Sequence, residues 1–302
     1  MTTPTIGVFD SGFGGLTVLR TLIARLPHAQ FAFLGDTARL PYGSKSRRTI
    51  ARYAAQSAQF LVREQGAEFL VIACNTASAL ALDAIQEAVP IPVLGVIEPG
   101  ASAARAASKT GDVLVIATDA TVHSQAYAAA CRAQGLRALE KACPLLVPLV
   151  EEGWLDFSIG SEASAARAAS APPQVEVTAQ VIRIYLDELL AEAEAANLNP
   201  DVLVLGCTHY PLLRPLIEAA VPAGMKVIDS AEAAAETAVH LFNEIPERYS
   251  EDLVIEGAKR VPSAAQAQIR CFATDSVEKF ERLGSRFLAR PTGKVELVDL
   301  GG

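Results

Sequence analysis

Two cysteines share a sequence context that could place their thiols in an active site. Cys74 directly follows the apolar run Phe69–Ala73, and Cys207 follows the apolar run Val202–Leu205 and one glycine. Each cysteine is in turn followed by polar residues that could open a helix. Ligands of open α/β sheets bind beyond the carboxyl ends of the strands, and a helix start at that place favours a thiolate. About half of the chain separates the two cysteines, which hints at two related half-molecules.

The residues beside these thiols fit two kinds of chemistry. In the first, His209 is the base of a cysteine–histidine pair in which Cys207 is the nucleophile. In the second, the two thiols act as an acid and a base on opposite sides of a substrate. The spacing alone favours neither. The remaining cysteines, Cys131, Cys143 and Cys271, lack this context, and we expect them to be core residues.

Acidic residues follow two further apolar runs. Asp10 opens the glycine-rich segment Asp10–Gly15, which has neither the spacing of a dinucleotide-binding motif nor the Gly-Lys-Ser/Thr of a phosphate loop. A tight turn with unusual backbone angles would explain its glycines. It would not explain an acid at the mouth of a crevice, so Asp10 is a candidate functional residue. Glu151 and Glu152 could also reach the crevice, or they could form a solvated pair.

Short apolar runs alternate with helical patterns along the chain, which predicts an α/β fold with helices covering parallel sheets. The runs are near-continuous, as in strands buried on both faces: Thr5–Phe9, Phe31–Leu34, Phe69–Ala73, Val93–Ile97, Val113–Ala117, Leu145–Leu149, Val202–Leu205 and Lys226–Ile228. The longest helical pattern covers Val175–Ala195. Its predicted buried stripe is Val177, Val181, Ile184, Tyr185 and Leu189, and the helix could also contact a second copy of the chain. Ser161–Pro173 is predicted to be a surface loop or short helix.

Length and composition limit the classes of function. The 302 residues suggest two domains, and 51% hydrophobic residues suffice for real cores. A net charge of −8 argues against sequence-independent nucleic-acid binding, which needs Lys and Arg to neutralise phosphates. We see neither a membrane-spanning run nor a signal peptide, and five cysteines are an odd number, so we expect free thiols in the cytoplasm. With four histidines and no C-x-x-C, a structural zinc site is not expected.

Several motifs together resemble glutamate racemases, of the aspartate/glutamate racemase superfamily. The motifs are Ile6–Leu16, Gly35–Thr37 with Pro41–Gly43, Ala73–Ala77, Leu146–Gly153, Gly206–Leu212 and Phe272–Ser276. They follow one another in the family's order over nearly the whole chain. The segment Ile116–Thr121 departs from the Gly-Thr expected in the family, which leaves the roles of Thr118 and Thr121 open.

The resemblance implies two α/β domains with similar parallel sheets, related by pseudo-twofold symmetry, with the active site in the cleft between them. The first domain would comprise residues 1–98 and 212–302, and the second residues 99–211. The chain would first cross between domains at Glu98-Pro99-Gly100. We expect a homodimer that binds glutamate, with no nucleic acid and no membrane.

The resemblance also implies an activity and its residues. The activity is cofactor-independent interconversion of L- and D-glutamate, which supplies D-glutamate for peptidoglycan synthesis, and no metal is implied. Cys74 would deprotonate D-glutamate with help from Asp10. Cys207 would deprotonate L-glutamate with help from His209 and Glu152. The implied substrate contacts are Asp10, Ser11, Tyr42, Gly43, Asn75, Thr76, Thr208 and His209.

Two alternative functions would use the same scaffold. A racemase of aspartate or another amino acid of the same superfamily would need the same two thiols. A non-catalytic amino-acid-binding protein would not need them, because binding alone requires no thiol pair.

Overall fold

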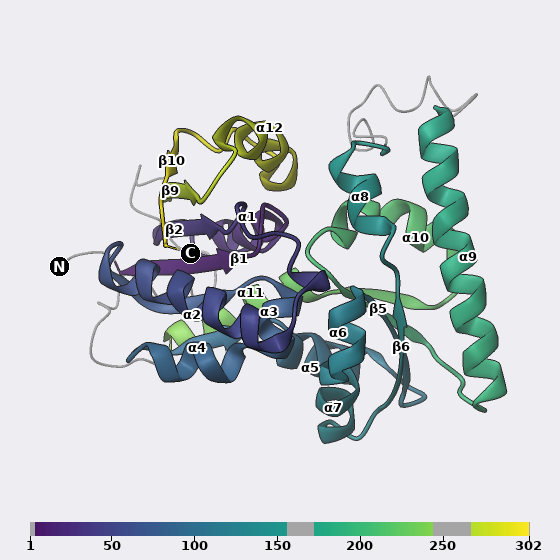
Figure 1. The fold of residues 1–302 in the computed structure, drawn as a ribbon. Coiled ribbons are helices and arrows are strands. Elements are labelled where there is room, and N and C mark those ends of the chain that lie inside the picture. The colour runs from purple at the N-terminus through teal and green to yellow at the C-terminus, as the bar shows by residue number, and fades with distance from the viewer. Residues whose placement is uncertain (1–3, 156–171, 244–266, 302) are drawn as a thin grey trace, which may run out of the picture.

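The computed structural model describes residues 4–155, 172–243 and 267–301 as two lobes, each built on its own parallel sheet (Figure 1). The first sheet contains, in spatial order, β10 (Val295–Leu297), β9 (Gln268–Ala273), β2 (Gln30–Gly35), β1 (Thr5–Asp10), β3 (Ala67–Ile72) and β4 (Val93–Gly95). The second contains β6 (Arg137–Ala142), β5 (Asp112–Ala117), β7 (Val202–Gly206) and β8 (Lys226–Asp229). All neighbouring strands are parallel. The predicted α/β class with two parallel sheets is confirmed.

The two sheets repeat one strand order. The central part of the first sheet is ordered β2-β1-β3-β4, and the whole second sheet is ordered β6-β5-β7-β8. Strand for strand, β3 corresponds to β7, and these are the strands that precede Cys74 and Cys207. The similarity of the two cysteine segments in the sequence therefore reflects equivalent positions in the two sheets.

Helices cover both faces of each sheet because alternate strand residues belong to different cores. In the first lobe, α1 (Leu16–Arg25) and α12 (Val277–Leu288) pack on one face, and α2 (Arg47–Arg63) and α4 (Leu82–Ala88) pack on the other. In the second lobe, α8 (Leu146–Glu151), α9 (Pro173–Ala195) and α10 (Arg214–Ala220) lie on one face, opposite α5 (Ile97–Ala107) and α7 (Ala126–Ala133). The short helices α3 (Asn75–Leu80) and α6 (Asp119–Ser124) and the turn at Tyr42–Ser44 border the space between the lobes.

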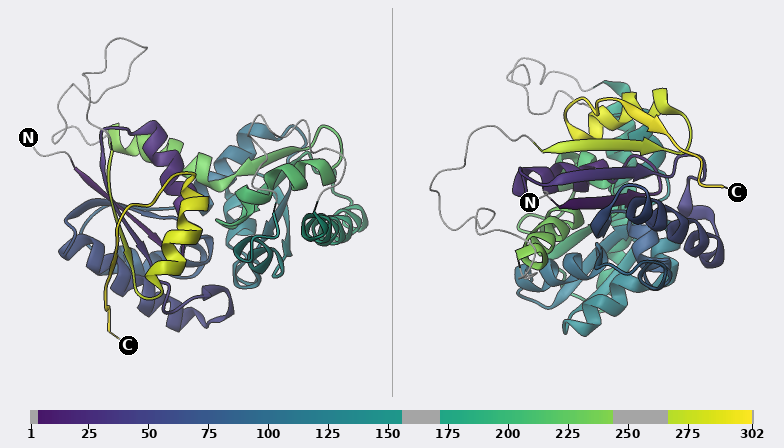
Figure 2. Two further views of the ribbon diagram at one scale, coloured as in Figure 1. Left: turned by 90° about the horizontal axis from the view of Figure 1, so that it is seen from above. Right: turned by 90° about the vertical axis from the view of Figure 1, so that its left-hand side faces the viewer.

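The lobes lie side by side, with α9 on the outer side of the second lobe (Figure 2). The helix α11 (Ser230–Asn243) contacts both α1 and α5 and so packs between them. Glycines with positive φ turn the chain from helix to strand at Gly66, Gly111, Gly135 and Gly224, where other residues would be strained.

Three expectations from the sequence are wrong in detail. The run Leu145–Leu149 is not a strand but part of α8, where Leu146 and Val150, four residues apart, are buried. The adjacent strand is β6, whose half-exposed, charged sequence gave no apolar signal. The domain boundary at residue 212 is also misplaced, because α10 and β8 belong to the second lobe and the chain returns after Asp229.

The third correction concerns α9. Its buried stripe is Val175, Thr178, Ile182, Leu186, Leu189 and Ala193, whereas the predicted members Val177 and Ile184 are 43% and 52% exposed. The predicted surface segment Ser161–Pro173 lies, apart from its last two residues, outside the described part of the chain. Of the helices that the structure describes, none has the length and apolar character to span a bilayer.

Candidate active site

A cleft of about 610 Å³ lies between the lobes and contains both candidate thiols. The first lobe contributes Ser11, Gly12, Leu40–Ser44 and Cys74–Thr76 to its lining. The second contributes Thr118, Asp119, Pro144, Val147, Pro148, Glu151, Glu152 and Cys207–His209. All implied substrate contacts except Asp10, which lies beneath the surface, are therefore brought together.

Cys74 is held where β3 meets α3. It is the N-cap residue of that helix: its Sγ accepts a hydrogen bond from Ala77 N at 3.4 Å and donates one to Ser11 Oγ at 3.3 Å. Burial, helped by the negative charge of Asp10, raises the pKa of the Cys74 thiol to about 12. Cys74 is therefore a protonated thiol near neutral pH, and it needs a base to become a thiolate.

Asp10 ends β1 and supplies a carboxylate beneath the cleft. It is 1% exposed; Oδ2 accepts a hydrogen bond from Gly12 N at 2.9 Å, and Oδ1 has no partner among the described residues. Burial raises the pKa of Asp10, although the positive charge of His209 acts in the opposite direction. A buried carboxylate with one unpaired oxygen is suited to exchange a proton with a neighbouring thiol.

The glycines beside Asp10 let the two lobes approach each other. A Cβ atom at Gly14 would lie 2.7 Å from His209 Nδ1, and one at Gly15 would lie 2.6 Å from Asp10 Cβ. Thr17 Oγ1 lies 2.9 Å from Gly14 O and 3.1 Å from Thr208 O, so it ties the turn to the opposite lobe. Neither glycine has a positive φ, so close approach rather than unusual backbone angles explains them.

Cys207 lies beside a buried histidine and a carboxylate. Its Sγ is 3.9 Å from His209 Nδ1, and His209 Nε2 is 3.2 Å from Glu151 Oε1. Burial opposes a positive ring, but the hydrogen bonds to Cys207 and Glu151 raise the pKa of His209 to about 10. The ring is therefore an imidazolium at neutral pH, and an imidazolium beside a sulfur stabilises negative charge on that sulfur.

The acid that contacts His209 is Glu151, and the predicted Glu152 is wrong in this role. Glu152 borders the cleft, but its side chain is exposed. Glu151, by contrast, also forms an ion pair with Lys279 of α12, with Oε2 3.5 Å from Nζ. Because this segment is helical, Glu151 shares a face with Val147 four residues earlier, which also lines the cleft. Helical spacing was the signal in the sequence that could have identified it.

Other predicted residues have contacts that refine their roles. Tyr42 is buried, and its hydroxyl donates to Asp36 Oδ2 at 2.6 Å, so this hydroxyl already has a partner in the first lobe. The hydroxyl of Thr76 lies 3.0 Å from that of Thr118 and 3.3 Å from that of Thr121, which joins the lobes beside the cleft. Asp36 was not anticipated, because nothing in its local sequence shows that it holds Tyr42.

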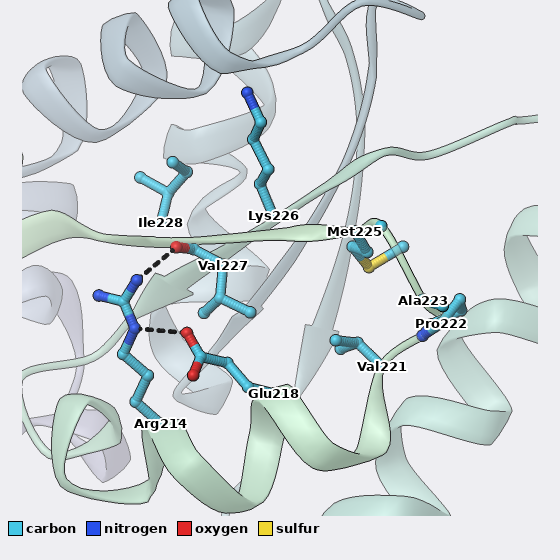
Figure 3. Close-up of a pocket in the computed structure, with 10 residues that line it drawn as sticks. Arg214, Glu218, Val221, Pro222, Ala223, Met225, Lys226, Val227 and Ile228 are labelled. Carbon is cyan, nitrogen blue, oxygen red and sulfur yellow. Dashed lines mark hydrogen bonds and ion pairs between the residues drawn. The ribbon is translucent and has the colours of Figure 1, made fainter.

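A second, more open cavity of about 490 Å³ lies between α10 and β8 (Figure 3). Its charged groups are already paired: Arg214 Nε is 2.8 Å from Glu218 Oε1, and Arg214 Nη2 donates to Val227 O at 3.2 Å. Neither thiol lines it. Among residues 4–155, 172–243 and 267–301, no three His, Cys, Asp or Glu side chains are grouped to hold a metal ion.

Comparisons with known proteins agree with this geometry. A profile of the Asp/Glu/hydantoin racemase family matches residues 7–238. A glutamate racemase of Koribacter versatilis is 50% identical over 99% of this chain and 98% of the relative. A glutamate racemase isoform from Bacillus anthracis has a similar structure, with a TM-score of 0.79 and 33% identity over 98% of each chain. The glutamate racemase of Francisella tularensis, in complex with D-glutamate, matches with a TM-score of 0.79 and 34% identity over 99% of this chain and 98% of that one.

The contact between Glu151 and His209 predicts a measurable titration. The His209 ring should stay protonated up to about pH 10, and Glu151→Gln should lower its pKa because the anionic partner is removed. Because folding raises the pKa of His209 from 6.5 to about 10, the protonated ring stabilises the folded state fully below pH 6.5. This contribution is lost as the pH rises through about 10. The stability difference between the wild type and Glu151→Gln should therefore shrink over that interval.

NMR titration of the histidine ring protons, with urea unfolding at several pH values, measures both effects. Glu152→Gln is the matched control and should leave the pKa of His209 unchanged. An equal downward shift in both variants would contradict the assignment of Glu151.

Proposed function

The chain belongs to the Asp/Glu/hydantoin racemase family, and we propose that it interconverts L- and D-glutamate with Cys74 and Cys207 as acid and base. The observation that carries the proposal is the placement of two thiols, from equivalent strands of two lobes, in one cleft. Each thiol has its own charged neighbour, Asp10 for Cys74 and His209 for Cys207. The D-glutamate formed supplies peptidoglycan synthesis.

The reaction moves one proton off and another proton onto the same carbon. From L- to D-glutamate, the Cys207 thiolate accepts the α-proton, and the C–H electron pair passes to Cα and the α-carboxylate. The Cys74 thiol then donates its proton to the opposite face. The S–H bond formed at Cys207 balances the one broken at Cys74, and proton exchange with solvent restores the starting enzyme.

The protonation states of the cleft fit this direction of reaction. The raised pKa of about 12 keeps the proton on Cys74, and the protonated ring of His209 lies 3.9 Å from the sulfur of Cys207. For the reverse reaction, starting from the restored enzyme, Asp10 takes the proton from Cys74 and the His209 ring gives one to Cys207. The side chains of Asn75, Thr76 and Thr208 supply donors for the α-carboxylate as negative charge builds on it.

Two alternative functions are less well supported. A racemase of aspartate would use the same thiols, but the extended similarity is to glutamate racemases. A binding protein would not need two thiols that each have a separate proton partner. The chemistry requires reduced thiols, which supports a location in a reducing compartment, the cytoplasm.

The α8–α9 face also fits a homodimer. We define this face by Leu145, Trp154, Val177 and Ile184, whose apolar side chains are 38–54% exposed. They are adjacent: Leu145 N donates to Tyr185 Oη, and Thr178 Oγ1 donates to Trp154 O. A self-complementary apolar surface is the usual basis of a twofold dimer.

Sedimentation velocity tests the dimer. The wild type should sediment as a dimer at micromolar concentration. Ile184→Asp should give monomers, because a dimer interface would bury the aspartate's charge. Leu297→Asp is the control, since Leu297 is an exposed apolar residue on β10, away from this face. A monomeric wild type would refute the proposal.

Racemisation in D2O tests the activity and the two-thiol chemistry together. With a chelator present and without added pyridoxal phosphate, L-glutamate should yield D-glutamate that carries solvent deuterium at Cα. The remaining L-glutamate should contain little deuterium at low conversion, because the two faces are served by different thiols. Proton NMR of the separated enantiomers measures this. Aspartate racemised in preference to glutamate would overturn the substrate, and retention of the original α-proton in the product would overturn the mechanism.

Substitution of single cysteines tests the site. Cys74→Ser and Cys207→Ser should each lower kcat by about 10²–10⁴-fold, because a hydroxyl is too weak an acid to replace a thiol. Cys131→Ser, Cys143→Ser and Cys271→Ser are matched controls and should keep most of the activity, with some loss of stability, since all three are buried. Circular dichroism of glutamate follows turnover. Near-normal kcat in either of the first two variants would remove that thiol from the site.

A further inference from the structure

Behind the cleft, three buried polar side chains join the two lobes. Tyr127 of α7 has its Oη 2.6 Å from Asn75 Oδ1, and Asn75 Nδ2 lies 3.5 Å from Ser230 Oγ. Ser230 Oγ in turn donates to Leu205 O in β7 at 3.1 Å. All three side chains are almost completely buried, and neither Tyr127 nor Ser230 lines the cleft.

The direction of each hydrogen bond in this group follows from Ser230. Its only hydroxyl proton is used on Leu205 O, so Ser230 Oγ can only accept from the Asn75 amide nitrogen. Asn75 Oδ1 must then face Tyr127, which donates. Burial raises the pKa of Tyr127 above its usual value, so the phenol keeps its proton and remains a donor.

This arrangement determines what Asn75 presents to the cleft. The amide nitrogen carries two hydrogens, of which one points to Ser230, and the other is available to a ligand. A rotated amide would instead present its carbonyl oxygen, which repels a carboxylate. The Tyr127 hydroxyl therefore selects the orientation that can bind an anion at Asn75, the residue directly after Cys74.

The ring of Tyr127 is fixed against the strand that leads to the other thiol. A Cβ atom at Gly206 would lie 2.9 Å from Tyr127 Cε2, and one at Gly100 would lie 3.3 Å from Tyr127 Cε1. The ring thus packs between α5 and the end of β7, one residue before Cys207. Through Tyr127, the Asn75 amide has a defined position relative to both thiols.

We propose that Tyr127 is a positioning residue that holds the Asn75 amide with an N–H directed into the cleft, where it binds the α-carboxylate of the substrate. This inference rests on the proposed function, because it takes Asn75 as a substrate contact. Tyr127 does not line the cleft and acts through Asn75, together with Ser230, which also hydrogen-bonds with the tyrosine hydroxyl.

Tyr127→Phe tests the inference, because it removes the hydroxyl and leaves the ring in place. We expect kcat/KM for glutamate to fall about tenfold, the value of one hydrogen bond to a charged group, with most of the loss in KM. A variant that merely lowers the folded fraction would reduce kcat at unchanged KM. Tyr185→Phe is the matched control and should keep its KM, since that hydroxyl accepts a hydrogen bond from Leu145 N and neither residue lines the cleft.

A double-mutant cycle decides whether Tyr127 acts through Asn75. In an Asn75→Ala background, the further change Tyr127→Phe should alter kcat/KM by less than about twofold. An equal loss in both backgrounds, or no loss in the wild-type background, would overturn the inference and leave the thiol chemistry intact. Normal turnover in the cysteine variants would instead overturn the proposed function.

Ser230→Ala provides a second route if Tyr127→Phe does not fold. It removes the acceptor of the Asn75 amide and keeps the tyrosine, so KM should rise in the wild-type background and not in Asn75→Ala. A rise of the same size in both backgrounds would show that Ser230 acts independently of Asn75 and would contradict the hydrogen-bond directions assigned here.

Discussion

The proposed reaction needs two thiols on opposite faces of one carbon, and the architecture meets this constraint by holding two equivalent strand ends in register. The repeated strand order brings β3 and β7, with Cys74 and Cys207, to one cleft. The lobes are then fixed to each other by close contacts: Gly14 admits Thr208 and His209, and Thr17 bonds across the boundary. Each contact crosses between lobes within a few residues of a thiol.

Equivalent strands nevertheless place their thiols in different electrostatic surroundings. The neighbour of Cys74 is the negative Asp10, whereas the neighbour of Cys207 is a positive ring held by Glu151. The two enantiomers of a substrate have equal free energies, so the reaction itself requires no such difference. The difference gives each side of the cleft its own proton partner, a carboxylate beside Cys74 and an imidazole ring beside Cys207.

What could be predicted from the sequence was local. The strand-end context of Cys74 and Cys207 lies within a few residues, as does that of the acid at the end of β1, and both cysteines line one cleft in the structure. The resemblance implied Glu152, whereas the residues alone left Glu151 and Glu152 equal, and only the helical period shows that Glu151 faces His209. β6 was missed because a partly exposed strand carries no apolar run. Tyr127 could not be identified, since its partner Asn75 lies 52 residues away and its own helix has an ordinary pattern.

The outer strands of both sheets determine how readily the sheet edges can pair with other chains. Exposed strand edges invite pairing with other chains, and short or charged edge strands prevent it. Here β10 and β4 have three residues each and β8 has four, while β6 carries Lys141, which pairs with Glu188 and Glu192 of α9. Among the strands in the described ranges, none of the outer ones offers a long apolar template for intermolecular β-pairing. Short and charged edges therefore disfavour self-association of this protein through its two described sheets, whereas its helices are not restricted in this way.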